Sequence, residues 1–372
     1  MLILLQPLYA ESTGCGDVWE CQNACPHDGK AVEIDFAYTG GIFSNVHGGE
    51  RRKTVYTGVL DLGITAETEK LGLWKNGQFF VGSFFAHGNL ITDFVGDYQD
   101  PVNYAYGIPA QVSEYWYRHQ FFQEKLSVKV GKQDDCATFF FLDAKGDFVN
   151  NSFTFPAGTR LVTLPETTWG ITTALELPLD FVWKGAIKDA DGNANTFWMS
   201  ELKNLVYMTQ IERPHTFFST LPGFAFFGVW HDTTDEGKYG LSMGIEQTVW
   251  QSQVCPARKK RDREVTFFSH LGTFEKNRSD LRRYWDIGFT HRGLLVSRPD
   301  DLLGFGCCTV YFSPGFRAAE NMIYSFESAF ELFYKFKLTE HVVLQPDVQY
   351  IIHPGGQHKD ATVLGLVFQF SL

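Results

Sequence analysis

The chain has 372 residues, a formal net charge of −11 and 16% aromatic residues. The negative charge argues against nucleic acid as a partner, because surfaces that bind nucleic acid are strongly basic. No apolar run reaches the roughly 18 residues of a membrane-spanning helix, which excludes a membrane protein built from helices. The length exceeds that of a typical small domain, but one large β-barrel could use all of it.

The first ten residues resemble the apolar core and the cleavage site of a secretory signal. Met1 to Leu5 are all apolar, and the small Ala10 precedes a polar stretch, but the usual charged start is missing. We therefore interpret residues 1–10 as a residual signal-like segment and residues 11–30 as an N-terminal arm that contains cysteines. Residues 31–372 are expected to form a single β-barrel domain.

The chain has seven cysteines, an odd number. In an oxidising compartment disulfides would be the default, and at least one thiol would remain free or pair with another chain. Cys21 and Cys25 are separated by three residues, a spacing found in pairs of zinc ligands, but no second pair completes a site. We therefore expect no metal and no cofactor. Cys307 and Cys308 are neighbours in a predicted strand and would point to opposite faces.

Alternating apolar and polar residues predict β-strands along most of the chain. Lys75-Asn76-Gly77 predicts a hairpin turn between two of them. Sustained helical periodicity and linker-like composition are both missing, which favours a single all-β domain. The clearest alternating stretches are residues 32–39, 56–64, 126–130, 241–249, 285–289, 324–338, 342–352 and 364–372.

The last three of these stretches are about as long as the 9–11 residues that a tilted strand needs to cross a bilayer. Alternation alone does not separate a membrane barrel from a soluble β-sandwich. Charges on the polar face favour the barrel, because they suit a wet lumen. We therefore predict a transmembrane antiparallel β-barrel. The charged side chains expected to face its lumen are Glu33, Asp35, Asp61, Lys129, Glu246, Asp286, Glu327, Glu331 and Lys335.

Residues 136–165 do not alternate and are rich in Asp, Asn, Gly and Pro. A long irregular segment within a compact domain is usually functional or disordered. In a barrel it could fold into the lumen and narrow it. A basic run from Arg258 to Arg263 is interpreted as a solvated loop.

Two stretches near the C-terminus resemble those of a known family. Residues 292–306 (RGLLVSRPDDLLGFG) resemble the RGxxxxRPxDxxGxG stretch of carbohydrate-selective porins of the OprB family. Residues 331–356 closely resemble that family's penultimate-strand signature, and weaker matches in family order begin at about residue 31. The family-like residues that we single out are Arg298, Asp300, Asp301, Gln345, Asp347 and Gln349.

The resemblance implies an outer-membrane barrel of about sixteen strands that admits sugars by passive diffusion through a constricted eyelet. Such passage needs weak, numerous hydrogen bonds and aromatic faces for pyranose rings. The expected partners are small sugars and outer-membrane lipid or lipopolysaccharide, and the chain could be a monomer or a homotrimer. Our candidates for the eyelet are Asp61, Glu114, Lys129, Asp134, Asp143, Lys145, Asp147, Arg160 and Trp169.

Three alternatives stay open. An enzyme could use paired acids such as Asp134 with Asp135, but the sequence shows no nucleophile elbow, zinc helix or phosphate loop, so we expect no catalytic residues. A surface adhesin or a structural envelope protein could use the same barrel and pair its cysteines with another chain. A channel could also carry other small anions, such as dicarboxylates.

Overall fold

A computed structural model describes residues 30–161, 163–191, 203–217, 220–234, 237–252, 254–255, 260–261, 263–275 and 279–372. The signal-like segment lies outside these residues, and so does the cysteine-containing arm apart from Lys30. Arg258 and Lys259 of the basic run lie outside them as well.

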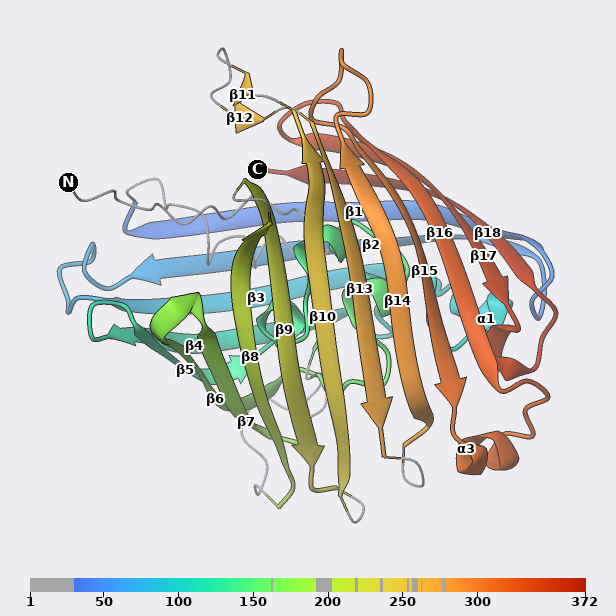
Figure 1. The fold of residues 1–372 in the computed structure, drawn as a ribbon, viewed down its shortest axis with the longest axis horizontal. Coiled ribbons are helices and arrows are strands. Elements are labelled where there is room, and N and C mark those ends of the chain that lie inside the picture. The colour runs from blue at the N-terminus through green and yellow to red at the C-terminus, as the bar shows by residue number, and fades with distance from the viewer. Residues whose placement is uncertain are drawn as a thin grey trace.

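The described residues form a closed antiparallel barrel of sixteen strands, in which each strand pairs with its neighbours along the chain (Figure 1). The ring closes where β1 pairs with β18, with Ile42 opposite Leu366. This confirms the predicted all-β barrel. The strands are β1 (Val32–His47), β2 (Lys53–Glu67), β3 (Gly77–Gly88), β4 (Ala110–Phe121), β5 (Leu126–Gln133), β6 (Thr168–Glu176), β7 (Val182–Asp189), β8 (Leu205–Phe217), β9 (Leu221–Asp232), β10 (Lys238–Gln251), β13 (Glu264–Phe274), β14 (Leu281–Arg292), β15 (Leu302–Phe312), β16 (Phe326–Lys337), β17 (Val342–Ile352) and β18 (Ala361–Ser371).

The remaining elements are short and lie in the connections between barrel strands. None of the described helices is long and apolar enough to cross a membrane. These elements are the ribbon β11 (Val254–Cys255) and β12 (Lys260–Arg261), the α-helices α1 (Thr92–Val95), α2 (Asn151–Thr154) and α3 (Pro314–Ala319), and the 3-10 turns η2 (Cys136–Thr138), η3 (Asp143–Lys145), η4 (Pro178–Asp180) and η5 (Pro354–Gly356).

The strands have two distinct faces because successive side chains point to opposite sides. In β16, Leu332 points outward and is 47% exposed, whereas Glu331 and Phe333 on either side of it point inward and are 0% and 1% exposed. The outward face is apolar in other strands too, as Ile64 and Ile245 show. An apolar outer face and a polar inner face are what a barrel in lipid requires.

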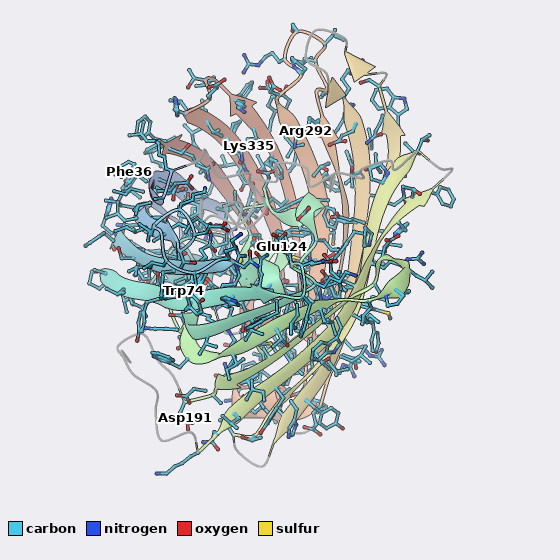
Figure 2. All side chains as sticks on the ribbon, turned by 90° about the vertical axis from the view of Figure 1, so that its left-hand side faces the viewer. Phe36, Trp74, Glu124, Asp191, Arg292 and Lys335 are labelled. Atoms are coloured by element: carbon cyan, nitrogen blue, oxygen red, sulfur yellow. The ribbon has the colours of Figure 1, made fainter. Side chains whose placement is uncertain are left out.

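Two connections fold into the barrel. The first is the α1 loop (residues 89–109), which joins β3 to β4, and the second is the inner segment (residues 134–161 and 163–167), which joins β5 to β6. Both leave the same end of the barrel, opposite the end where β1 begins and β18 finishes. In Figure 1 the green inner segment runs behind β10 and β13, and Figure 2 shows it among the strands from another side.

An apolar core lies between the inner segment and the wall. The ring centroid of Phe148 lies 4.4 Å from the ring centroid of Phe153 and 5.0 Å from that of Phe333 on β16. Glycines of β15 make room for these rings: a Cβ on Gly304 would lie 2.2 Å from the Phe333 ring, and a Cβ on Gly306 would lie 2.7 Å from the Phe153 ring. The inner segment is therefore packed against the wall as tightly as a protein interior.

Candidate functional site

The inner segment follows the inside of the wall and contacts one strand after another. Near its start, Lys184 of β7 donates a hydrogen bond of 3.1 Å to the carbonyl of Thr138. The N–H of Phe140 then donates to Gln210 of β8 at 2.8 Å. These contacts satisfy backbone groups that form no strand ladder of their own.

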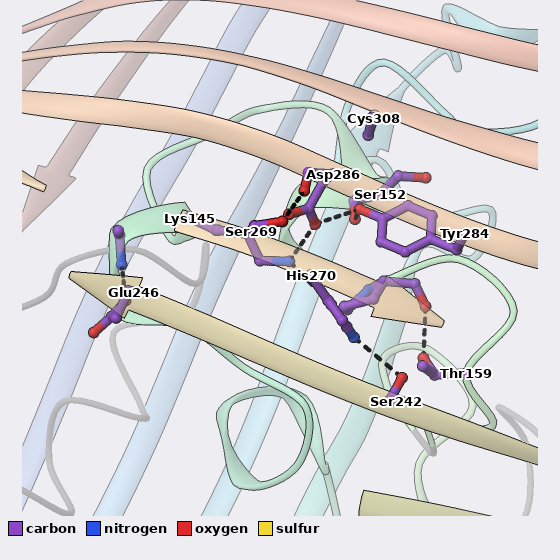
Figure 3. Close-up of polar contacts among 12 residues, drawn as sticks. Lys145, Ser152, Thr159, Ser242, Glu246, Ser269, His270, Tyr284, Asp286 and Cys308 are labelled. Carbon is purple, nitrogen blue, oxygen red and sulfur yellow. Dashed lines mark hydrogen bonds and ion pairs between the residues drawn. The ribbon is translucent and has the colours of Figure 1, made fainter. Parts of the chain in front are cut away.

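The middle of the inner segment is held by the charged network in Figure 3. The N–H of Ala144 donates to Glu246 of β10 at 2.9 Å. Lys145 is fully buried and donates to Asp286 of β14 at 2.6 Å, with His270 of β13 at 3.4 Å. An ammonium group without water is tolerated only because this carboxylate lies against it.

The inner segment reaches furthest around the wall at β16 and β17. The N–H groups of Val149 and Asn150 donate to the two oxygens of Glu331, at 2.7 and 2.8 Å. The side-chain amide of Asn150 donates to Gln349 at 3.1 Å, and Gln349 donates to the carbonyl of Pro101 in the α1 loop at 2.9 Å. One pair of wall strands therefore holds both inserted connections.

The inner segment then returns toward β6. Tyr284 of β14 donates to the carbonyl of Ser152 at 2.6 Å. Arg160 forms an ion pair of 2.6 Å with Asp232 of β9, and the Arg160 side chain keeps 37% of its exposure. The segment thus runs from β5 to β17 and back, so it lines a large part of the inner circumference.

The α1 loop is held by one carboxylate. Glu327 of β16 accepts hydrogen bonds from the N–H groups of Tyr98, Gln99 and Gly355, at 2.8, 3.0 and 2.6 Å. Glu327 is fully buried. Three N–H groups from two connections converge on this one carboxyl group, so the side chain ties the loop to the 353–360 turn and to the wall.

Three carboxyl groups in the connections titrate unusually. Burial raises the pKa of Asp97 to about 6. Burial, together with the nearby Asp97 charge, raises the pKa of Asp100 to about 8. Burial and the charge of Glu114 raise the pKa of Asp134 to about 7. The connections therefore contain groups that change charge near neutral pH.

Comparison with known proteins identifies the family. The model of the carbohydrate-selective porin family, OprB, matches residues 51–235 and 231–372. The chain belongs to this family. Porin B of Pseudomonas aeruginosa is 23% identical over 398 residues, which cover 91% of this chain and 87% of that protein.

Solved structures share the fold. The high-pH structure of Pseudomonas putida OprB has a TM-score of 0.81 at 19% identity and covers 92% of this chain and 94% of that one. The outer-membrane channel DcaP of Acinetobacter baumannii has a TM-score of 0.54 at 7% identity, covering 92% and 97%. The family match makes the chain an outer-membrane sugar porin. The end that carries its two longest connections, residues 89–109 and 134–167, corresponds to the extracellular end, because porin loops are longer there than the periplasmic turns.

The structure of the porin places the predicted eyelet residues in different surroundings. Asp143 is exposed, and Lys129 is partly exposed, with its ammonium 5.3 Å from the Trp116 ring centroid. Arg160 is partly exposed, as described above. By contrast, Asp61 and Lys145 are fully buried. Glu114 and Asp134 are joined by a hydrogen bond from the N–H of Asp134, and Asp147 pairs with Lys335 of β16 at 2.5 Å.

Trp169 does not face the lumen. It follows Thr168 in β6 and points outward beside Ile171, which is 47% exposed. Its indole N–H donates to Tyr115 at 3.0 Å, and that residue lies on the same outer face of β4. The sequence prediction placed Trp169 in the eyelet, where its ring could stack on a sugar. The face to which each residue of β6 points was not known at that stage, and a shift of one residue exchanges the two faces of a strand.

The family-like residues have structural contacts. Arg298 forms an ion pair with Asp301, which also accepts hydrogen bonds from Tyr334 and from the N–H of Lys337, both at 3.1 Å. These contacts fix the turn between β14 and β15, where Asp300 also lies. In β17, Gln345 donates to the carbonyl of Asp147 at 2.9 Å, and Asp347 accepts from Gln349 at 3.0 Å.

Sequence reasoning missed the role of Glu327 and Glu331. Their inward position predicted contact with a wet lumen, but both are fully buried and accept backbone hydrogen bonds. Period-2 alternation shows the face of a side chain and not what covers that face. Lys184, which faces inward on β7 with 20% of its side chain exposed, was missed because residues 182–189 alternate poorly.

The adjacent cysteines of β15 point to opposite faces, as their positions in the sequence predicted. Cys307 and Cys308 are both buried and free. Cys308 points inward, and Cys307 points outward opposite Ile287. Among the residues that the structure describes, no group of three or more His, Cys, Asp or Glu side chains is arranged to hold a metal ion.

Proposed function

We propose that sugars diffuse past the inner segment through a passage lined by the inward charges that keep contact with solvent. Lys129 and Arg118 lie on neighbouring strands, β5 and β4, in register with each other, and both are partly exposed. The exposed Asp143 lies near Glu246 of β10, six strands along the barrel from β4. The unequal exposure of inward charges is the observation that supports this assignment.

Charges of both signs on two sides of a passage suit neutral polyols. A sugar hydroxyl donates to a carboxylate and accepts from an ammonium or guanidinium group, so several weak contacts replace its hydration. Such contacts must favour entry without slowing exit. Arg160 lies nearer the extracellular end beside Asp232, where it would meet a sugar first.

A planar bilayer tests the proposal directly. Refolded porin should give stepwise conductance, and glucose or maltose at millimolar concentration should block part of it. Conductance blocked only by succinate would keep the channel and change its cargo. Folded, heat-modifiable protein without conductance would favour the adhesin or structural alternative.

The dicarboxylate alternative has one observation in its favour. Arg118, Lys129 and Lys184 place three cationic side chains on the inner faces of β4, β5 and β7. Lys184 is already paired with Glu212 at 2.9 Å, which reduces the net positive charge there. A sugar therefore remains the better match, and the order of block by maltose and succinate decides between them.

A further inference from the structure

The tip of the inner segment, residues 147–150, is held by hydrogen bonds and an ion pair from two neighbouring wall strands, β16 and β17. Glu331 of β16 accepts from the N–H groups of Val149 and Asn150, and Gln349 accepts from the Asn150 side chain. Glu331 and Gln349 face each other across the β16–β17 ladder and are both 0% exposed. These two side chains form a clamp in which every contact goes to the inserted connections or to the wall.

A second pair of contacts aligns the same tip. Lys335 of β16 forms an ion pair with Asp147, and Gln345 of β17 donates to the carbonyl of Asp147. The inward side chains of β16 and β17 thus follow the tip residue by residue. The aromatic contact between Phe148 and Phe333 fills the space between the two sets of polar contacts.

The clamp fixes the distance between the tip of the inner segment and the barrel wall. A carboxyl group that accepts two adjacent backbone N–H groups at 2.7 and 2.8 Å leaves the tip little freedom to move from the wall. Without an acceptor, two buried N–H groups would have to find another hydrogen-bond partner, and this favours a shift of the tip from its present position. The free cross-section beside the tip therefore depends on this side chain.

We propose that Glu331 and Gln349 are positioning residues of the pore, which set the width of the constriction without touching the sugar. This proposal rests on the proposed function only in that the inner segment is taken to narrow the passage. It also explains why the family-like stretch at 331–356 contains polar residues that are buried. Their partner is the inner segment and not the solute.

The test compares single channels of Glu331→Ala and Gln349→Ala with native porin. Both variants should still form heat-modifiable barrels but should show altered, noisier conductance and a sugar block about tenfold weaker, equivalent to about 1.4 kcal/mol of binding. Thr309→Ala is the matched control. It removes a hydroxyl contact of 2.8 Å to Ser328 on the outward face of the β15–β16 pair and should leave conductance and block unchanged.

Glu331→Gln keeps the test decisive if the alanine variant fails to assemble. Its amide keeps one acceptor oxygen, so one of the two N–H groups should lose its hydrogen-exchange protection and conductance should change less than in the alanine variant. Native conductance, native block and native protection of Val149 and Asn150 in Glu331→Gln and Gln349→Ala would overturn the proposal.

The two proposals fail separately. Native porin that conducts but is not blocked by sugar, with altered conductance in the Glu331 variants, would refute the sugar assignment and keep the clamp. Native porin blocked by sugar, with unaltered Glu331 and Gln349 variants, would refute the clamp and keep the sugar assignment.

Discussion

Two parts of the inner wall carry similar polar side chains and use them differently. On β14, β16 and β17, Asp286, Glu331 and Gln349 are all 0% exposed and bind the inner segment. On β5 and β7, Lys129 and Lys184 keep part of their exposure. The difference shows that an inward position in a barrel does not by itself mean contact with lumen water. A charge is buried only where a partner offsets its desolvation.

The largest expected effect comes from breaking the buried pair in the first region. Asp286→Ala leaves the Lys145 ammonium buried beside His270, so the free energy of unfolding should fall by about 3–5 kcal/mol. Urea titration of the refolded barrel, followed by tryptophan fluorescence, measures this loss. Replacing both partners, as Lys145→Met with Asp286→Leu, should recover much of it.

The exposed pair between β2 and β3 is the control for this measurement. Glu69 and Lys75 lie 3.7 Å apart with side chains 56% and 80% exposed, so Glu69→Ala should cost no more than about 1 kcal/mol. Equal losses for Asp286→Ala and Glu69→Ala would contradict the distinction between buried and solvated charges.

In the second region, charge removal should change ion selectivity and leave assembly intact. Lys129→Ala should shift the reversal potential under a potassium chloride gradient toward cation selectivity, because a positive group leaves the passage. Asp143→Ala should shift it the other way. Shifts of the same sign, or none in either variant, would show that these side chains do not line the passage.

The α1 loop should respond to pH. The pKa of Asp100 in the folded protein is about 8 against a usual 3.8, so the folded state holds a proton that the unfolded state releases between these values. The stability that the loop contributes should therefore fall as pH rises from about 4 to 8. Hydrogen exchange of residues 89–109, corrected for intrinsic rates, should be less protected at pH 8.5 than at pH 5.5.

Asp100→Asn provides the matched variant, because its amide oxygen can still accept from the N–H of Val102, which lies 3.2 Å from the native carboxylate. The variant should lose most of the pH dependence. Asp97 would leave a remainder, since its pKa is also raised, to about 6. An unchanged pH profile in Asp100→Asn would contradict the assignment of the response to this carboxyl group.

The smallest effect is expected for Trp169→Phe. The change removes an outward hydrogen bond to Tyr115 and should cost about 1 kcal/mol or less. Sugar block and conductance should match native porin. A weakened block would falsify the outward placement of this side chain.

The local alternation and composition of the sequence were sufficient to predict much of the fold. The alternation in residues 324–338 and 342–352 predicted β16 and β17, and the irregular composition of residues 136–165 predicted a segment inside the barrel. Strand period and turn chemistry are properties of adjacent residues, so the sequence contains them directly. The two family-like stretches then gave the family that the comparisons show.

The candidate site could be predicted only in part. Asp143, Lys129 and Arg160 keep exposure as the eyelet prediction requires, but Lys145 and Asp61 are buried, and Trp169 is on the outer face. These outcomes depend on the register of each strand and on the route of the inner segment, and neither is encoded by neighbouring residues.

By itself, the sequence determined which residues alternate, and hence an apolar outer face and a polar inner face. The tertiary structure decided which inward polar groups meet water and which meet backbone N–H groups more than a hundred residues away, as Glu331 does with Val149. The physical reason is that burial of a charge is set by its partners, and here the partners are brought together only when the barrel closes around its own connection.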